Sequence, residues 1–245
     1  MASEHIHGWI YEIFSSIQGE GLYCGQRQTF VRLAGCNLAC DYCDTPSSRD
    51  PKPACCKVEK PAGSDRFIEI ANPASVEQIL GECKELGCKT IAITGGEPLV
   101  QVDFLENLLS ALKDAGMFTY LETNGTLYKE LASVVSYADV VAMDIKLASA
   151  SGHDYWDEHR QFLEVAGVTE VFVKMVVSAG TTEEEIHHCS DLIAEVDHNV
   201  PLVIQPVTAS APVPGAILMR FQEIASEKLA DVRVIPQCHK LLGIL

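Results

Sequence analysis

Three cysteines near the start of the chain restrict what this sequence can fold into more than any other feature. Cys36, Cys40 and Cys43 follow a Cys-x3-Cys-x2-Cys spacing. Thiolates are soft ligands that suit zinc or iron–sulfur clusters, and a closed structural site of either kind usually has four protein ligands. No further cysteine or histidine completes this run at such a spacing. Three thiolates on a four-iron cube leave one iron open, so the run predicts a cluster that can hold a cofactor.

These cysteines could also have one of two simpler roles. The run could be a zinc knuckle with a distant fourth ligand, or the three side chains could simply be buried in the core. Buried cysteines would not need Gly35 and Asn37, which let the backbone bend around the ligands. Iron and sulfide analysis of anaerobically purified protein would separate a cluster from a zinc ion.

Length and composition limit the class of protein. A chain of 245 residues with 47% hydrophobic residues is expected to form one large domain. Its net charge of −16 argues against a broad nucleic-acid surface, because phosphate contacts need clustered Lys and Arg. No apolar run reaches the ~18–20 residues of a membrane span, and no signal peptide is visible at the N-terminus. We therefore expect a cytoplasmic protein with no nucleic-acid or membrane partner, whose remaining cysteines are mostly free thiols.

Apolar segments of strand length alternate with amphipathic segments of helix length. Ser75 with Gln78, and Thr182 with Glu185, are capping-box pairs that predict helix starts. The strand segments are apolar throughout, which is typical of a parallel sheet covered by helices. Polar and glycine-rich residues follow most of these segments, and sites in parallel α/β folds gather at that end of the strands. Strands are expected at residues 9–14, 28–33, 90–94, 118–122, 140–144, 171–177 and 202–206, and the apolar segment 232–235 follows the last predicted helix.

Residues 46–66 interrupt this alternation. The segment contains Pro51 and Pro53 directly before Cys55 and Cys56, and proline-rich stretches are typical of loops. We expect a solvent-facing loop insert within a single domain that spans residues 1–245. A second metal site or a redox role for the cysteine pair is the alternative.

Three further motifs suggest ligand contacts. Gly95-Gly96-Glu97-Pro98 follows a predicted strand, and its glycines would let backbone carbonyls approach an ammonium group; a simple turn before a helix is the alternative. Residues 18–21, Gln-Gly-Glu-Gly, could bind a heterocycle edge or form an ordinary polar turn. Arg32 ends a strand beside the cysteine run, where it could bind a carboxylate with two parallel hydrogen bonds or form a structural salt bridge.

Together, the cysteine run and the Gly-Gly-Glu-Pro motif resemble the radical S-adenosylmethionine (radical SAM) superfamily. The finer pattern resembles the 7-carboxy-7-deazaguanine synthase family over nearly the whole chain, apart from residues 46–66. The segments that carry this resemblance are residues 18–21, 30–38, 43–45, 94–98, 122–125, 144–146, 205–206 and 237–240.

The resemblance implies a fold and a reaction. The fold would be an incomplete (β/α) barrel with about six parallel core strands and small N- and C-terminal additions, working as a homodimer. The enzyme would be a carbon–nitrogen lyase that converts 6-carboxy-5,6,7,8-tetrahydropterin to 7-carboxy-7-deazaguanine with loss of ammonia, towards queuosine and other deazapurines. It would use a [4Fe-4S] cluster, S-adenosylmethionine, Mg²⁺ and an electron donor such as flavodoxin or ferredoxin. A radical-activating enzyme that acts on a partner protein is the closest alternative.

The resemblance also implies residue roles. Cys36, Cys40 and Cys43 would ligate the cluster, Thr45 would ligate Mg²⁺, and Arg32 would take part in catalysis. S-adenosylmethionine would contact Tyr42, Asp44, Gly95, Gly96, Glu97, Lys146, Ser149, Ser151 and Gln205. The pterin would contact Ile17, Gln18, Gly19, Glu20, Arg32, Thr94, His239 and the terminal carboxylate of Leu245. The stretch after Lys146 departs from the Pro–Ser–Ser–Gly-like segment that is usual in the family.

Overall fold

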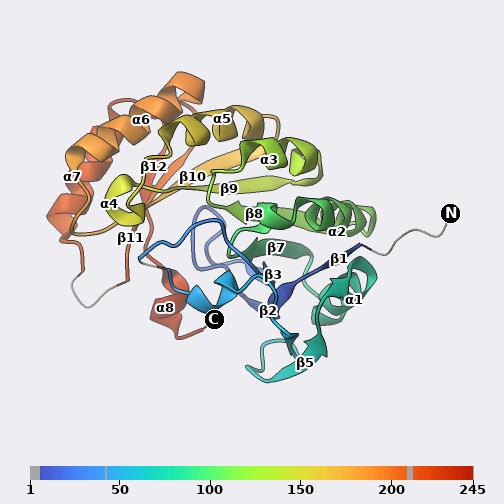
Figure 1. Cartoon of the computed structure of the whole chain (residues 1–245). Helices are drawn as coiled ribbons and strands as arrows, with labels where there is room; N and C mark the ends of the chain where they lie inside the picture. Colours follow the sequence, from blue (N-terminus) through green and yellow to red (C-terminus); the bar gives the residue numbers. More distant parts are fainter. Residues whose placement is uncertain (1–5, 42, 209–211, 245) are drawn as a thin grey trace.

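The fold of the chain is an open, mostly parallel α/β sheet. The computed structural model describes residues 6–41, 43–208 and 212–244. Within these residues one large sheet has ten strands, and most of the helices curve around one face of it (Figure 1). From edge to edge the strands are β12 (Val232–Val234), β11 (Leu202–Pro206), β10 (Glu170–Val177), β9 (Val140–Ile145), β8 (Phe118–Thr123), β7 (Thr90–Gly95), β3 (Arg27–Leu33), β2 (Ile10–Ile17), β4 (Cys55–Glu59) and β5 (Phe67–Ala71).

Parallel pairing runs without interruption from β12 to β3. Six of these strands form the parallel core, and β12 adds a short seventh of three residues. Beyond β3 the sheet changes character, because β2 runs antiparallel to β3. The edge strands β12 and β5 do not pair with each other in the described sheet, so it is not closed. The predicted incomplete barrel is thus confirmed.

The helices begin and end where local chemistry directs them. Ser75 and Gln78 form the predicted capping box at the start of α1 (Val76–Leu86), and Gly87 ends it in a left-handed conformation with φ 77°. Thr182 and Glu185 form the second predicted capping box, at the start of α6 (Glu183–Asp197). The other helices are α2 (Val102–Asp114), α3 (Tyr128–Val134), α4 (Ala148–Ser151), α5 (Trp156–Ala166), α7 (Gly215–Ser226) and α8 (Cys238–Leu242), with short 3₁₀ turns at η1 (Pro46–Arg49), η2 (Pro98–Gln101) and η3 (Val135–Tyr137).

Residues 46–66 are not simply a loop, and this part of the prediction is wrong. Residues 55–59 form β4, which pairs in parallel with β2 and antiparallel with β5. Cys56 and Val58 are fully buried while Lys57 is exposed, the alternation of a strand with one covered face. Cys56 is therefore not solvent-facing; the prolines that precede the strand hid its alternation. The remaining strands, β1 (His7–Gly8) and β6 (Ala74–Ser75), form a separate two-stranded pairing.

The two faces of the sheet differ in how much hydrophobic core they carry. The outer face and the helices form the main hydrophobic core. A much smaller apolar cluster lies on the inner face, with Phe14, Phe30, Tyr120 and Phe172 among its members. Among the described residues, we find no helix with the length and apolar character that crossing a bilayer requires. The inner face of the sheet is the surface left for a site.

Candidate active site

A cavity of about 230 Å³ opens on the inner face, at the carboxyl ends of the parallel strands. Strand alternation explains its composition, because residues two apart in a strand point to the same face. One layer of inward side chains is apolar, and the next layer towards the strand ends is polar. The polar layer consists of Arg32, Thr94, Glu122, Asp144, Lys174 and Gln205, one each from β3, β7, β8, β9, β10 and β11.

The cysteine loop forms one wall of this cavity. Cys36, Cys40 and Cys43 all line it, although they come from an irregular loop after β3. Gly35 has φ 89°, and its N–H donates to the carbonyl of Ser48 at 2.8 Å. The predicted ligands are therefore brought to one place by a loop that backbone hydrogen bonds hold.

The Gly-Gly-Glu-Pro turn packs directly against that loop. The N–H of Glu97 donates to the carbonyl of Gly35 at 2.8 Å. A Cβ atom on Gly96 would lie 2.1 Å from the same carbonyl oxygen, so only glycine fits. Gly95 and Gly96 line the cavity beside the cysteines, where their backbone can face a ligand.

Glu97 itself lies behind the wall of the cavity. Its side chain is fully buried and accepts hydrogen bonds from Leu99 N, Thr123 Oγ1 and Asn124 N at 3.1, 2.9 and 2.7 Å. Burial raises the pKa of this carboxyl group to about 7, although the three hydrogen bonds and the charge of Lys146 oppose the rise. The carboxylate thus ties the ends of β7 and β8 together rather than facing the cavity.

The donor set fits an iron–sulfur cluster with an open iron. Three thiols line the cavity, and no fourth cysteine among the described residues does so. Burial raises the pKa of the Cys36 and Cys40 thiols, and the positive charge of Lys146 opposes the rise at both. Across the cavity Gln205 is buried, and its Oε1 has no hydrogen-bond partner among the residues that the structure describes. A cofactor that binds between the thiols and this amide would supply the missing partner.

An alternating row of charges crosses the floor of the cavity. Glu20 is paired with Lys174, Lys174 lies 3.3 Å from Asp144, and Asp144 lies 3.0 Å from Lys146. Burial alone would raise the pKa of Glu20, but the charge and hydrogen bond of Lys174 outweigh it and lower that pKa to about 2. Glu20 is therefore a fixed anion at neutral pH.

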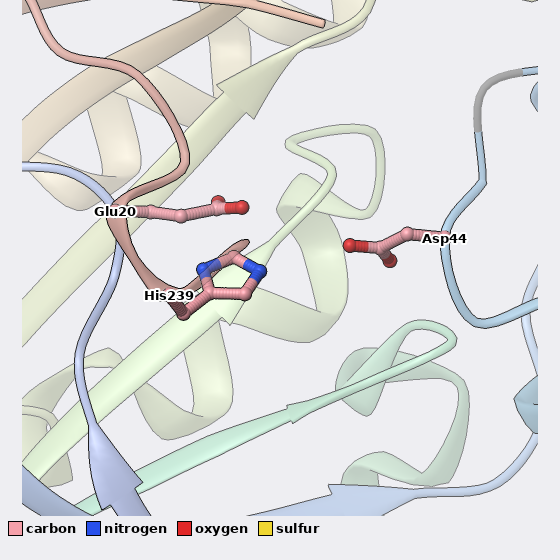
Figure 2. A group of neighbouring side chains, drawn as sticks. All are labelled: Glu20, Asp44 and His239. Carbon is pink, nitrogen blue, oxygen red and sulfur yellow. The ribbon is translucent and has the colours of Figure 1, made fainter. Parts of the chain in front are cut away.

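Figure 2 shows Glu20, Asp44 and His239 converging from three separate segments. Their ligand atoms lie within 4.8 Å of one another, close enough to suggest a metal site. The carboxylates already have cationic or amide partners, however: Glu20 binds Lys174 and accepts from Gln237 Nε2 at 2.8 Å, and Asp44 lies 3.8 Å from Lys240. This charge balance favours a polar subsite for an organic ligand over a metal site.

Arg32 lines the cavity but is only partly available for a ligand. Its Nε donates to Glu12 at 2.8 Å, and its guanidinium lies 5.9 Å from the Phe14 ring centre. The guanidinium makes no other hydrogen bond to the described residues, so its terminal nitrogens can face a carboxylate. Both roles expected of Arg32, salt bridge and ligand contact, are compatible with this geometry. Arg49, from the 3₁₀ turn η1, lines the cavity as well.

The structure brings most of the predicted site residues together and leaves some apart. Predicted residues that line the cavity, besides those described above, are Ile17, Gln18, Gly19, Thr45 and Thr94. Ser149 and Ser151 do not line it: the N–H of Ser149 donates to Glu185 at 2.8 Å, and the hydroxyl of Ser151 lies 2.9 Å from the carbonyl oxygens of both Leu147 and His153, to either of which it can donate. Tyr42 and Leu245 lie outside the described residues.

Sequence reasoning missed two charged residues of the cavity and gave no role to others. Lys174 and Arg49 belong to none of the motifs, while Glu122, Asn124, Asp144 and Gln237 belong to motifs but had no assigned contact. A signal for Lys174 existed: it is the one charge within the apolar run Val171–Val177.

Comparisons with known proteins agree with this geometry. The family model described as "Radical SAM superfamily" matches residues 30–193. The chain is 43% identical to the 7-carboxy-7-deazaguanine synthase of Geobacter sulfurreducens over 244 residues, covering 96% of each chain. It is 35% identical to the enzyme of that name from Methanopyrus kandleri, covering 96% of this chain and 94% of that one.

Solved structures show the same fold at lower identity. QueE from Escherichia coli superposes with a TM-score of 0.66 at 23% identity, covering 98% of this chain and all of that one. SuiB from Streptococcus suis, solved with S-adenosylmethionine bound, gives a TM-score of 0.54 at 17% identity, covering 82% of this chain and 45% of that one.

Proposed function

The chain belongs to the 7-carboxy-7-deazaguanine synthase family of the radical SAM superfamily, and we propose that it is itself such an enzyme. As a carbon–nitrogen lyase it converts 6-carboxy-5,6,7,8-tetrahydropterin to 7-carboxy-7-deazaguanine with loss of ammonia, in deazapurine biosynthesis. The observation that carries the proposal is one cavity with two unlike halves: three thiols on one wall, and charged groups with aromatic rings opposite.

The thiol half fits the cofactors. Cys36, Cys40 and Cys43 would hold a [4Fe-4S] cluster by its three closed irons. Bound there, the reduced cluster and S-adenosylmethionine together supply the 5′-deoxyadenosyl radical that begins the reaction. The cavity residues that would contact S-adenosylmethionine are Asp44, Gly95, Gly96, Lys146 and Gln205.

The opposite half fits a flat, polar heterocycle that carries a carboxylate. Phe14, Phe30 and Tyr120 provide apolar surface for the faces of a ring. Glu20 and His239 can accept or donate hydrogen bonds at its edge, and Arg32 can bind its carboxylate. Ile17, Gln18, Gly19 and Thr94 complete this half.

Three further parts of the proposal rest on family membership. Mg²⁺ would bind near Thr45, a residue of the cavity lining whose hydroxyl donates to Asp44 at 3.2 Å; oxygen ligands suit this hard cation. A homodimer, a flavodoxin or ferredoxin as electron donor, and a cytoplasmic location follow from the same membership. The closure of the cavity by Gln237 and His239 from the C-terminal segment favours a small molecule over a protein loop as substrate.

Anaerobic turnover tests the proposal. Reconstituted enzyme is incubated with the carboxytetrahydropterin, S-adenosylmethionine and dithionite, and products are identified by mass spectrometry. We expect the deazapurine and ammonia in equal amounts, and neither from a Cys40→Ala variant. Formation of 5′-deoxyadenosine without deazapurine would mean that the substrate is wrong although the superfamily is right. A protein-based glycyl radical, seen by electron paramagnetic resonance with a partner protein, would favour the activating-enzyme alternative.

A further inference from the structure

Lys174 is a partly buried cation for which neither the motifs nor the proposed reaction accounts. It lies at the middle of β10, in the register position opposite Asp144 of β9. Its side chain is only 16% exposed and lines the cavity. A lysine is rarely held this deep unless an anion compensates its charge. The identity of the anion therefore indicates what the lysine does.

Two carboxylates compensate the charge, and they come from different halves of the site. Lys174 Nζ donates to Glu20 Oε2 and lies 3.3 Å from Asp144 Oδ2. Asp144 has a second cationic partner, Lys146, next to the cysteine wall. The closest cationic partner of Glu20 is Lys174. Burial alone would lower the pKa of Lys174, but the charges of Glu20, Asp144 and Glu122 raise it well above its usual value. Lys174 is thus permanently charged.

The Glu20 carboxylate is held at both oxygens. Oε2 accepts from Lys174 and Oε1 accepts from Gln237 at 2.8 Å, while the Glu20 N–H donates to Gln18 at 3.1 Å. Each carboxylate oxygen has a second lone pair, and these are left to accept from N–H groups of a ligand in the cavity. A neutral carboxylic acid would instead present a proton to those N–H groups.

We infer that Lys174 is a positioning residue of the substrate subsite, which keeps the Glu20 carboxylate anionic and aimed at an N–H edge of the heterocycle. The inference rests on the proposed function for the identity of that heterocycle, but its electrostatic part does not. The other titratable groups close to Glu20 are His239 from α8, Asp44 from the cysteine loop, Glu122 and Tyr120 from β8, and Cys24. Among these only His239 can carry a positive charge, so Lys174 provides most of the compensation.

Kinetics of five variants test this role. Lys174→Met should raise the KM for the pterin about tenfold or more, most strongly at pH 6, where an uncompensated buried Glu20 binds a proton. Cleavage of S-adenosylmethionine without substrate is measured in parallel, because Asp144 links Lys174 to Lys146 of the cofactor half. Lys174→Arg should restore most of the affinity. In a Glu20→Gln background the Lys174→Met change should have little further effect on KM. Lys113→Met, which removes an exposed lysine paired with Asp139, is the matched control.

The contrary outcomes are distinct. Loss of S-adenosylmethionine cleavage in Lys174→Met, with a cluster still present, would place Lys174 at the cofactor instead. Penalties that simply add in the double variant would mean that it does not act through Glu20. Failure of the wild-type enzyme to use the pterin would overturn the proposed function, not this inference.

Infrared titration tests the electrostatic part without turnover. The carboxylic acid C=O stretch of Glu20 is obtained by subtracting the Glu20→Gln spectrum from that of the cofactor-free protein. In Lys174→Met the protonated band should appear at a pH higher by ~2 units or more. An unchanged titration in folded protein would overturn the inference. Lys174→Arg keeps the positive charge, so it should titrate like the wild type and serves as the control if Lys174→Met does not fold.

Discussion

The hydroxyl of Thr123 donates a 2.9 Å hydrogen bond to the fully buried carboxylate of Glu97. This contact joins the turn after β7 to the end of β8, and the 2.7 Å bond from Asn124 N strengthens it. The acid of the Gly-Gly-Glu-Pro motif thereby fixes two loops whose neighbouring residues line the cavity. Its main effect is on the shape of the site, through Gly95 and Gly96 on one side and Asn124 on the other.

Glu97 should make stability depend on pH. Its pKa is about 7 in the folded chain against an ordinary 4.5, so between these values the unfolded chain binds fewer protons. The free energy of unfolding should then fall as pH rises from 4.5 to 7, by up to about 3 kcal/mol. Glu97→Gln should flatten this slope while lowering stability by about 1–3 kcal/mol, because an amide cannot accept all three bonds.

Urea denaturation of the cofactor-free protein at pH 5 and pH 8 measures both effects. Glu184→Gln, an exposed change on α6, is the matched control and should leave the slope as it is. A wild-type slope that survives in Glu97→Gln would assign the pH dependence to other groups.

Much of the fold and part of the site could be predicted because they depend on local patterns. The cysteine spacing, the glycines of the Gly-Gly-Glu-Pro turn and the capping boxes at Ser75 and Thr182 are each contained in a few consecutive residues, and the structure has the loop, turn and helix starts that they predict. The apolar strands likewise predicted a parallel sheet, because a strand covered by helices needs no polar face.

Features that depend on register between distant segments could not be predicted in this way. The ion pairs of Lys174 cannot be predicted until β10 is known to pair with β9, which places Lys174 opposite Asp144, thirty residues earlier in the chain. β4 is similar. Its register between β2 on one side and β5 on the other decides that the side chain of Cys56 points into the core. Ser149 and Ser151 show the reverse case, since the chain after Lys146 turns into α4 and directs their hydrogen bonds away from the cavity.

Loss of any one of the three loop cysteines should abolish the cluster. Cys36→Ala, Cys40→Ala and Cys43→Ala should each lose the ~400 nm absorption of a [4Fe-4S] centre and all cleavage of S-adenosylmethionine. Cys88→Ala, which changes a cysteine away from the cavity, is the control and should retain both. A normal absorption band with normal cleavage in one of the three variants would remove that cysteine from the ligand set.

Arg32→Lys should weaken substrate binding more than its conserved charge suggests. Lysine cannot bind Glu12 through a planar guanidinium while presenting a second pair of donors to a carboxylate. Loss of a charge-assisted contact of about 1.5–3 kcal/mol corresponds to a rise in KM of roughly 10- to 150-fold. Arg220→Lys, at a bidentate pair with Glu183 on the surface, makes the same chemical change away from the site. Equal kinetics for Arg32→Lys and wild type would exclude carboxylate binding by Arg32.

Gly19 and His239 should be coupled by direct contact. A Cβ atom on Gly19 would lie 2.2 Å from His239 Nδ1, and the Gly19 carbonyl accepts from Cys238 N at 2.8 Å. Gly19→Ala should therefore push His239 and α8 out of place, raising the KM for the pterin about tenfold or more while substrate-free cleavage of S-adenosylmethionine continues.

Gly81 offers the same substitution without the clash, because nothing lies within 4 Å of its added Cβ in α1. Gly81→Ala should leave KM unchanged and stabilise the protein by roughly 0.5–1 kcal/mol, since alanine loses less backbone entropy in a helix.

The cause of the Gly19→Ala defect is then tested in a His239→Ala background, where the added methyl group has no ring to displace. A full further loss of affinity in that double variant would show that Gly19 acts on the substrate by a route other than His239.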